Sequence, residues 1–255
     1  FPERHIGNRI PFRELSINLI DRVLVCSHEG INYLKNEYPD FEEKIKLLSS
    51  GITKKDFKSK SSGDNKFRLL TLSRTDPVKR ISYLLKQLKS IEKISKFDIE
   101  YFHIGGDNVH GENSLQDLKN LSQNLNFKRF KINFLGKISD NDLNKFFRQS
   151  KIDVFLNVSS SEGTCLSLVE AMSYSIPVIV TKVGGNITIG NYMNTCLDVN
   201  FDYKDLYEYF EKIYLDNDYR ENLKLKSYKY WSKYHDSEVL RNEIKSEFKK
   251  ICFTT

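Results

Sequence analysis

Long apolar runs are missing from this sequence. No uninterrupted apolar stretch reaches the roughly 18 residues of a spanning helix, and no basic segment followed by an apolar one opens the chain. The chain has 255 residues, of which 39% are apolar and 29% charged, which is enough apolar material for an α/β core. We therefore expect a soluble globular protein with no membrane span and no secretion signal.

Closely spaced cysteines are missing as well. Four cysteines are scattered along the chain, with no C-x-x-C pair and no histidine cluster near them: Cys26, Cys165, Cys196 and Cys252. Zinc sites and disulfide frameworks need closer or patterned spacing. We interpret the cysteines as reduced thiols, expect no metal site, and place the protein in the cytoplasm.

A strong charge imbalance is also missing. The net charge is only +6, and the lysines are spread along segments rich in Asp and Glu, as on ordinary solvated helix faces. We therefore expect no nucleic-acid partner. A peripheral contact with anionic lipid at the inner face of the membrane stays open as an alternative, since it would suit an enzyme with a lipid-linked acceptor.

What the sequence does contain is a regular alternation of short β-prone runs and helical periodicity after a polar break at 58–66. The expected strands are 67–73, 99–104, 132–135, 153–158 and 177–181, with a short edge strand at 195–199. Helical periodicity continues from 203 to 251. This pattern predicts an α/β fold, a Rossmann-like doubly wound parallel sheet with helices on both faces and a helical C-terminus.

Charged and glycine residues follow successive expected strands at the point where each strand ends. Arg74 and Lys79 come after the first strand and Gly105 after the second. Because ligands of doubly wound sheets bind beyond the carboxyl ends of the strands, we expect these loops to face one crevice. Two cations at that place are suitable partners for a diphosphate.

The loop after the fourth strand leads directly into an expected helix. Gly163 permits a close backbone approach, and the free amides of Thr164, Cys165 and Leu166 at the helix start favour an anion. Glu170, one to two turns into that helix, can accept hydrogen bonds from a vicinal diol such as ribose. Each residue alone has an ordinary structural explanation, but together they predict a nucleotide site.

The stretch 161–185, SEGTCLSLVEAMSYSIPVIVTKVGG, closely resembles the signature of retaining GT-B glycosyltransferases, in which two glutamates with seven residues between them precede Ala-Met, Pro-Val and Gly-Gly. The resemblance implies one half of a GT-B fold. Its donor-binding Rossmann-like domain is expected at 67–216 after a linker at 58–66. Residues 1–57 then form a remnant of the N-terminal acceptor domain, and the helices at 217–255 pack back on it.

The resemblance also implies roles for individual residues. Arg74 and Lys79 match the pair that holds the donor diphosphate and stabilises the leaving group. Glu162 matches the glutamate near the donor sugar, and Glu170 the ribose ligand. The segment that meets the base is matched by Lys137 and Ile138. Such enzymes generally need no metal or other cofactor, and no role is assigned to His5.

The predicted function is a retaining glycosyltransferase with a nucleoside-diphosphate sugar donor, UDP in preference to GDP, and a glycan or lipid-linked glycan acceptor. Because most of the acceptor domain would precede residue 1, we expect the chain to be a fragment that binds the donor without turnover. Two alternatives stay open. One is a nucleotide-sugar epimerase of the same fold, and the other is a non-catalytic nucleotide-binding partner subunit.

Overall fold

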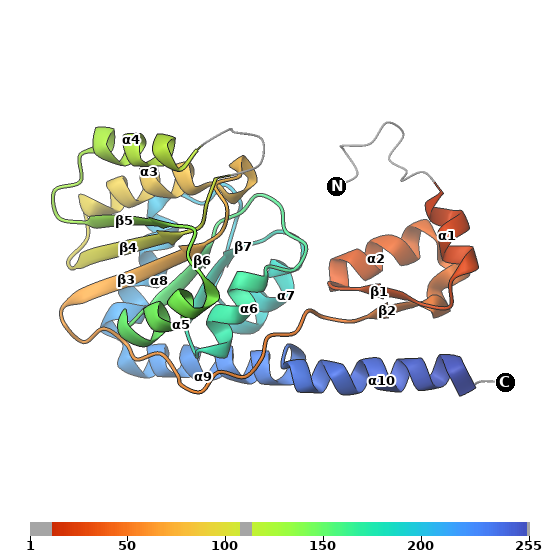
Figure 1. Ribbon diagram of the computed structural model, residues 1–255. Helices are drawn as coiled ribbons and strands as arrows, with labels where there is room; N and C mark the ends of the chain where they lie inside the picture. The colour runs from red at the N-terminus through yellow and green to blue at the C-terminus, as the bar shows by residue number, and fades with distance from the viewer. Residues whose placement is uncertain (1–11, 108–113, 254–255) are drawn as a thin grey trace.

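The computed structural model describes residues 12–107 and 114–253, so His5 lies outside the described residues. Two units are visible in Figure 1, a larger α/β domain and a smaller unit built from β1, β2, α1 and α2. An extended segment and the helices α9 and α10 join them.

The strands are β1 (Val23–Val25), β2 (Ile45–Leu47), β3 (Lys66–Leu72), β4 (Asp98–Ile104), β5 (Lys131–Gly136), β6 (Val154–Asn157), β7 (Val178–Thr181) and β8 (Cys196–Leu197). The helices are α1 (Arg13–Leu19), α2 (His28–Glu37), α3 (Ile81–Glu92), α4 (Leu115–Leu125), α5 (Asp140–Gln149), α6 (Leu166–Ser173), α7 (Asn186–Met193), α8 (Tyr203–Leu215), α9 (Asn217–Tyr234) and α10 (Ser237–Phe253), with short 3-10 turns η3 (Pro39–Lys44) and η4 (Pro77–Lys79).

The main sheet has six parallel strands in the order β5-β4-β3-β6-β7-β8. Every residue of β6 and β7 is buried, as expected for strands that helices cover on both faces. The doubly wound parallel sheet predicted from the sequence is thus confirmed. The edge strand β8 is shorter than the expected 195–199, because it pairs with β7 only at Cys196 and Leu197.

The helices form a layer on each face of this sheet. Helices α3 and α4 lie on one face, where α8 packs against α3, and α5, α6 and α7 lie on the other, where α9 packs against α6 (Figure 1). The chain runs from β3 outward to β4 and β5, then returns to β6 on the opposite side of β3. The topological switch point, where ligands of such sheets bind, therefore lies between the carboxyl ends of β3 and β6.

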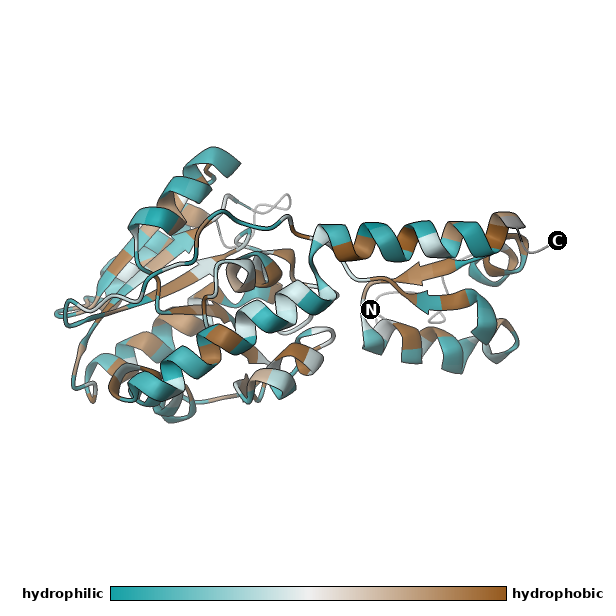
Figure 2. Cartoon of the chain, turned by 90° about the horizontal axis from the view of Figure 1, so that it is seen from below, coloured by the Kyte–Doolittle hydropathy of each residue, from teal (hydrophilic) through white to brown (hydrophobic). Residues whose placement is uncertain are grey.

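The smaller unit holds the parallel pair β1 and β2. Helix α2 begins at a serine cap, since the Ser27 hydroxyl accepts a hydrogen bond from the Gly30 amide. Helix α10 lies alongside the two strands, and in Figure 2 apolar residues occur on both α10 and the strands. Arg22 forms an ion pair of 3.5 Å with Glu247 across this contact. Within the described ranges, no helix combines the length and apolarity needed to cross a membrane.

Candidate functional site

The crevice between β3 and β6 brings together a cation and a carboxylate. Lys79 ends η4, directly after β3, and Glu162 lies in the loop after β6. Lys79 Nζ is 2.7 Å from Glu162 Oε1, and the Glu162 side chain is only 7% exposed. The Ser160 amide donates a 2.8 Å hydrogen bond to the Val78 carbonyl and fixes one loop on the other. Residues 83 positions apart thus form one charged pair at the switch point.

Glu162 is held by two further donors. Asn157 Nδ2 donates to Glu162 Oε1 over 3.0 Å, and the Ser159 hydroxyl donates to the same oxygen over 2.7 Å. Neither residue was assigned a role from the sequence. A signal was available for Asn157, because it is the polar last residue of an otherwise apolar buried strand. These bonds fix the carboxylate in one orientation within the crevice.

Glycines let two backbone segments touch beside this carboxylate. Gly184 has φ of 44°, and a Cβ there would lie 1.7 Å from the Glu162 carbonyl oxygen. The Gly185 amide donates a 3.0 Å hydrogen bond to the Gly163 carbonyl. A Cβ on Gly163 would meet no described atom within 4 Å. The backbone at Gly163 is therefore open to a close approach.

The start of α6 has amides that lack an acceptor inside the helix. Leu168 donates to the Cys165 carbonyl over 3.1 Å, so the amides of Cys165 and Leu166 precede the first hydrogen bond of the helix. Thr164, the third residue predicted to offer its amide, comes before the N-cap residue Cys165. The Cys165 side chain is buried, and burial, followed by the nearby charge of Glu162, raises the pKa of its thiol. Cys165 can therefore offer a ligand its amide, while its thiol belongs to the core.

The structure places Arg74 apart from this pair. Its side chain is 59% exposed and forms an ion pair of 3.0 Å with Asp76. Asp76 is a partner that the sequence did not reveal. Gly105 follows β4 with φ of 145°, and a Cβ there would lie 1.7 Å from the Ser73 carbonyl oxygen. Gly105 is thus required for the packing of two strand ends, and it places the loop after β4 beside Arg74.

The segment predicted to meet the base lies at the end of β5. Gly136 has φ of 71°, Lys137 is exposed, and Ile138 packs against the core. A Cβ on Gly106 would lie 3.5 Å from Lys137 Cβ. The loops after β4 and β5 are therefore neighbours at the same edge of the sheet as the Lys79 pair.

Glu170, the predicted ribose ligand, lies on the second turn of α6. Its carboxylate accepts a 2.9 Å hydrogen bond from Lys55 Nζ. Lys55 belongs to the extended segment between β2 and β3, where no periodicity in the sequence predicted a contact. Among residues 12–107 and 114–253, no group of three or more His, Cys, Asp and Glu side chains is arranged to hold a metal ion.

These features define a doubly wound Rossmann-like protein with a charged crevice at its switch point. Residues 52–230 match the family model of the glycosyl transferases group 1, and the chain belongs to that family. Protein CapJ of Staphylococcus aureus is 24% identical over 248 residues, which cover 95% of this chain and 60% of that protein. The chain thus spans about 60% of the length of this curated relative.

Solved structures share the fold. Sucrose-phosphate synthase from Thermosynechococcus elongatus superposes with a TM-score of 0.78 at 18% identity over 99% of this chain and 64% of that one. A glycosyltransferase from Rickettsia africae gives 0.76 at 17% identity over 97% and 69%. HepE of Anabaena in complex with UDP gives 0.72 at 16% identity over 94% and 69%. The fold is therefore that of a Rossmann-like half of the GT-B proteins.

Proposed function

We propose that this chain binds the nucleoside diphosphate of a nucleotide-sugar donor, UDP in preference to GDP, for a retaining glycosyltransferase. The observation that carries the proposal is the Lys79–Glu162 pair at the switch point, beside the open backbone of Gly163. A cation and helix amides are suited to a diphosphate, and we assign the fixed Glu162 carboxylate to the donor sugar. No metal or other cofactor takes part in this proposal.

The comparisons support the nucleotide. HepE of Anabaena was solved with UDP and with UDP-glucose, and its fold matches most of this chain. In the donor site that we propose, Arg74 turns from Asp76 to the diphosphate and the amides of Thr164 and Leu166 meet a phosphate. Lys137 and Ile138 border the base.

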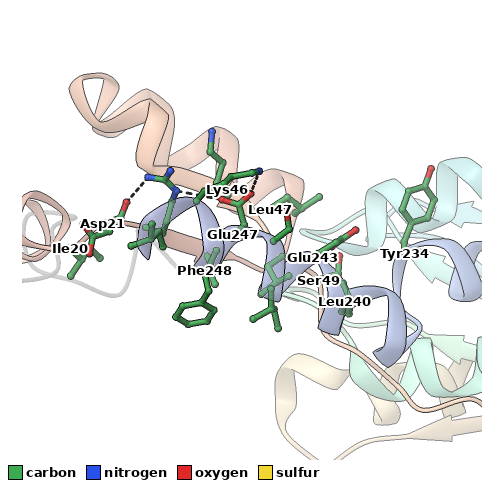
Figure 3. Close-up of a pocket in the computed structure, with 17 residues that line it drawn as sticks. Ile20, Asp21, Lys46, Leu47, Ser49, Tyr234, Leu240, Glu243, Glu247 and Phe248 are labelled. Carbon is green, nitrogen blue, oxygen red and sulfur yellow. Dashed lines mark hydrogen bonds and ion pairs between the residues drawn. The ribbon is translucent and has the colours of Figure 1, made fainter. Parts of the chain in front are cut away.

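The acceptor side of the proposal rests on an apolar groove of the smaller unit. A cavity of about 760 Å³ lies between the β1–β2 pair and α10 (Figure 3), and it is lined among others by Leu24, Leu47 and Phe248. These three side chains are large, apolar and exposed. A two-stranded sheet is marginal in water. We propose that further strands of an N-terminal acceptor domain complete this unit, in line with the greater length of the relatives.

The proposed acceptor is a glycan or lipid-linked glycan, and the proposed location is the cytoplasm, at the inner face of the membrane for a lipid-linked acceptor. All four cysteines are free thiols, which suits a reducing compartment.

Calorimetric titration of the folded chain with UDP, GDP and ADP tests the nucleotide proposal. We expect micromolar binding of UDP. At a UDP concentration one hundred times the dissociation constant, binding should stabilise the folded chain by about 2.7 kcal/mol and so raise its melting temperature. Arg74→Ala should weaken binding. Arg241→Ala is the matched control, because Arg241 is also 59% exposed and forms a 2.9 Å ion pair with Glu238 on α10. A folded chain that binds none of the three nucleotides would refute the proposal.

A sugar-transfer assay on the longer protein separates an enzyme from a non-catalytic subunit. An enzyme forms a glycoside with retained anomeric configuration, and Glu162→Gln should lower that rate while nucleotide binding persists. An epimerase would instead convert the donor sugar with no acceptor present.

A further inference from the structure

Lys55 and Glu170 form a contact between the interdomain segment and the helix of the nucleotide site. Lys55 Nζ lies 2.9 Å from Glu170 Oε1, and the two side chains are only 17% and 22% exposed. The residues are 115 positions apart. In Figure 1 the segment carrying Lys55 passes α6 and α9 on its way to β3.

The backbone that carries Lys55 is itself fixed on the large domain. Asp56, the next residue, forms a 2.7 Å ion pair with Arg148 of α5. Phe57 follows, with its ring centroid 5.0 Å from that of Tyr174. Lys55 and the two residues after it therefore each contact the domain, so the position of Lys55 is fixed from its C-terminal side.

The Lys55 ammonium has a second contact besides Glu170, with the ring of Tyr174. It lies 4.9 Å from the centroid of the Tyr174 ring, a favourable placement of a cation over an aromatic face. That ring is fully buried and stacks on Phe147 at 4.3 Å. Burial alone would lower the pKa of Lys55, but the hydrogen bond and charge of Glu170 raise it. Lys55 is therefore a charged donor held in one place.

We propose that Lys55 is a positioning residue that orients the Glu170 carboxylate toward the ribose hydroxyls and so sets the preference for a ribonucleotide. The inference rests on the proposed nucleotide site. A glutamate with free rotamers must be ordered when it binds a diol, and that ordering opposes binding. Lys55 orders Glu170 through Oε1, and the carboxylate keeps lone pairs on both oxygens for hydroxyl donors.

Two other roles for Lys55 predict different behaviour. If Lys55 only anchors the segment, its loss affects stability and weakens every nucleotide alike. If it competes with ribose for Glu170, its loss strengthens the binding of nucleotides that carry both hydroxyls. Only an orienting role makes the loss specific to the ribose hydroxyls.

The test compares UDP with 2′,3′-dideoxy-UDP in calorimetric titrations of the wild-type chain and Lys55→Met. We expect the wild type to prefer UDP, and Lys55→Met to reduce that preference about tenfold, the loss of one well-oriented charge-assisted bond. The affinity for dideoxy-UDP should stay unchanged. Lys54→Met is the matched control, since Lys54 is the exposed neighbour, and it should behave as the wild type. GDP and 2′,3′-dideoxy-GDP repeat the comparison for the other base.

Lys55→Arg, which keeps the charge, should restore most of the preference, and it also serves if Lys55→Met fails to fold. An equal loss for both nucleotides, an unchanged preference or a stronger preference for UDP in Lys55→Met would overturn the inference while leaving the nucleotide site intact. A folded wild-type chain that binds no nucleoside diphosphate would overturn the proposed function and this inference together.

Discussion

Lys79 Nζ lies 2.7 Å from Glu162 Oε1, so the cation that follows β3 and the carboxylate that follows β6 are paired with each other in the crevice between those strands. The pair links the two residues that the family resemblance assigns to the diphosphate and to the donor sugar. A diphosphate bound beside Gly163 would share the Lys79 ammonium with Glu162. In the proposed site, the pair would therefore connect the stability of the crevice with its affinity for the diphosphate.

Lys79→Met should destabilise the chain, because Glu162 is nearly buried and would keep only the neutral donors Asn157 and Ser159. We expect a loss of about 1–3 kcal/mol, below the full cost of breaking a buried pair because Lys79 is partly exposed. Urea unfolding measures it. The double variant with Glu162→Gln should lose less than the sum of the single variants. Additive losses, or an equal loss in the exposed control Lys86→Met, would contradict a coupled pair.

Substitution by alanine should change the stability of the chain much more at Gly184 than at Gly163. A Cβ on Gly184 would lie 1.7 Å from the Glu162 carbonyl oxygen at φ of 44°, so Gly184→Ala should cost about 3 kcal/mol or more from overlap and left-handed backbone. Gly163→Ala meets no described atom within 4 Å and should change stability by under about 0.5 kcal/mol.

Nucleotide affinity should separate these two variants a second time. The added methyl of Gly163→Ala stands where a phosphate is proposed to approach the backbone, so UDP should bind more weakly to a protein of unchanged stability. Thermal unfolding and calorimetric titration of both variants check the two readouts. Equal stability of the two variants would show that the contact between Gly184 and Glu162 is not tight.

The sequence predicted the sheet because its strands are continuous apolar runs bounded by polar loops, as at β6 and β7. The cap at Ser27 that begins α2 is a local interaction, of the kind that a sequence pattern can reveal. The crevice followed from the topology rule alone. What sequence pattern can predict is therefore what is periodic, local or fixed by strand order.

The partners of the site residues were not predictable in the same way. Asp76 holds Arg74, and Lys55 holds Glu170. The second contact depends on the path of an irregular segment through space, which leaves no periodic trace in the sequence. Asn157 is an intermediate case. Its polarity at the end of an apolar strand singles it out, but nothing in the sequence indicates that it pairs with Glu162.

Arg80 offers a test of backbone strain at the edge of the site. It has φ of 55°, in the left-handed region, which costs a non-glycine residue about 1 kcal/mol. Its guanidinium donates to the Val199 carbonyl and lies 4.1 Å from the Tyr83 ring centroid. Arg80→Ala loses these contacts and keeps the strain, whereas Arg80→Gly loses the contacts but relieves the strain.

We therefore expect Arg80→Ala to be less stable than Arg80→Gly by about 1 kcal/mol, with both less stable than the wild type. Urea unfolding of the three proteins measures the order. The same stability for both variants would mean that the backbone at this position is unstrained.

His103 makes the stability of the domain depend on pH. It lies fully buried on β4, with Nδ1 2.8 Å from the Thr71 hydroxyl. Burial lowers its pKa from 6.5 to about 4. The folded chain thus binds fewer protons than the unfolded chain between these values. The stabilisation is fully present above about pH 6.5 and is lost as the pH falls toward about 4.

The size of this effect follows from the two pKa values. Their difference is 6.5 − 4, or about 2.5, and one pKa unit corresponds to about 1.36 kcal/mol, so the effect on stability is about 3 kcal/mol. In His103→Phe this pH-dependent contribution is absent, while Thr71 keeps its 2.6 Å hydrogen bond with Tyr101. The wild type should therefore lose about 3 kcal/mol more than the variant between neutral pH and about pH 4, measured by urea unfolding at a series of pH values. His235, whose pKa burial also lowers, contributes equally to both proteins and cancels in the comparison. Parallel pH profiles would mean that His103 takes up its proton in the folded chain as readily as in the unfolded one.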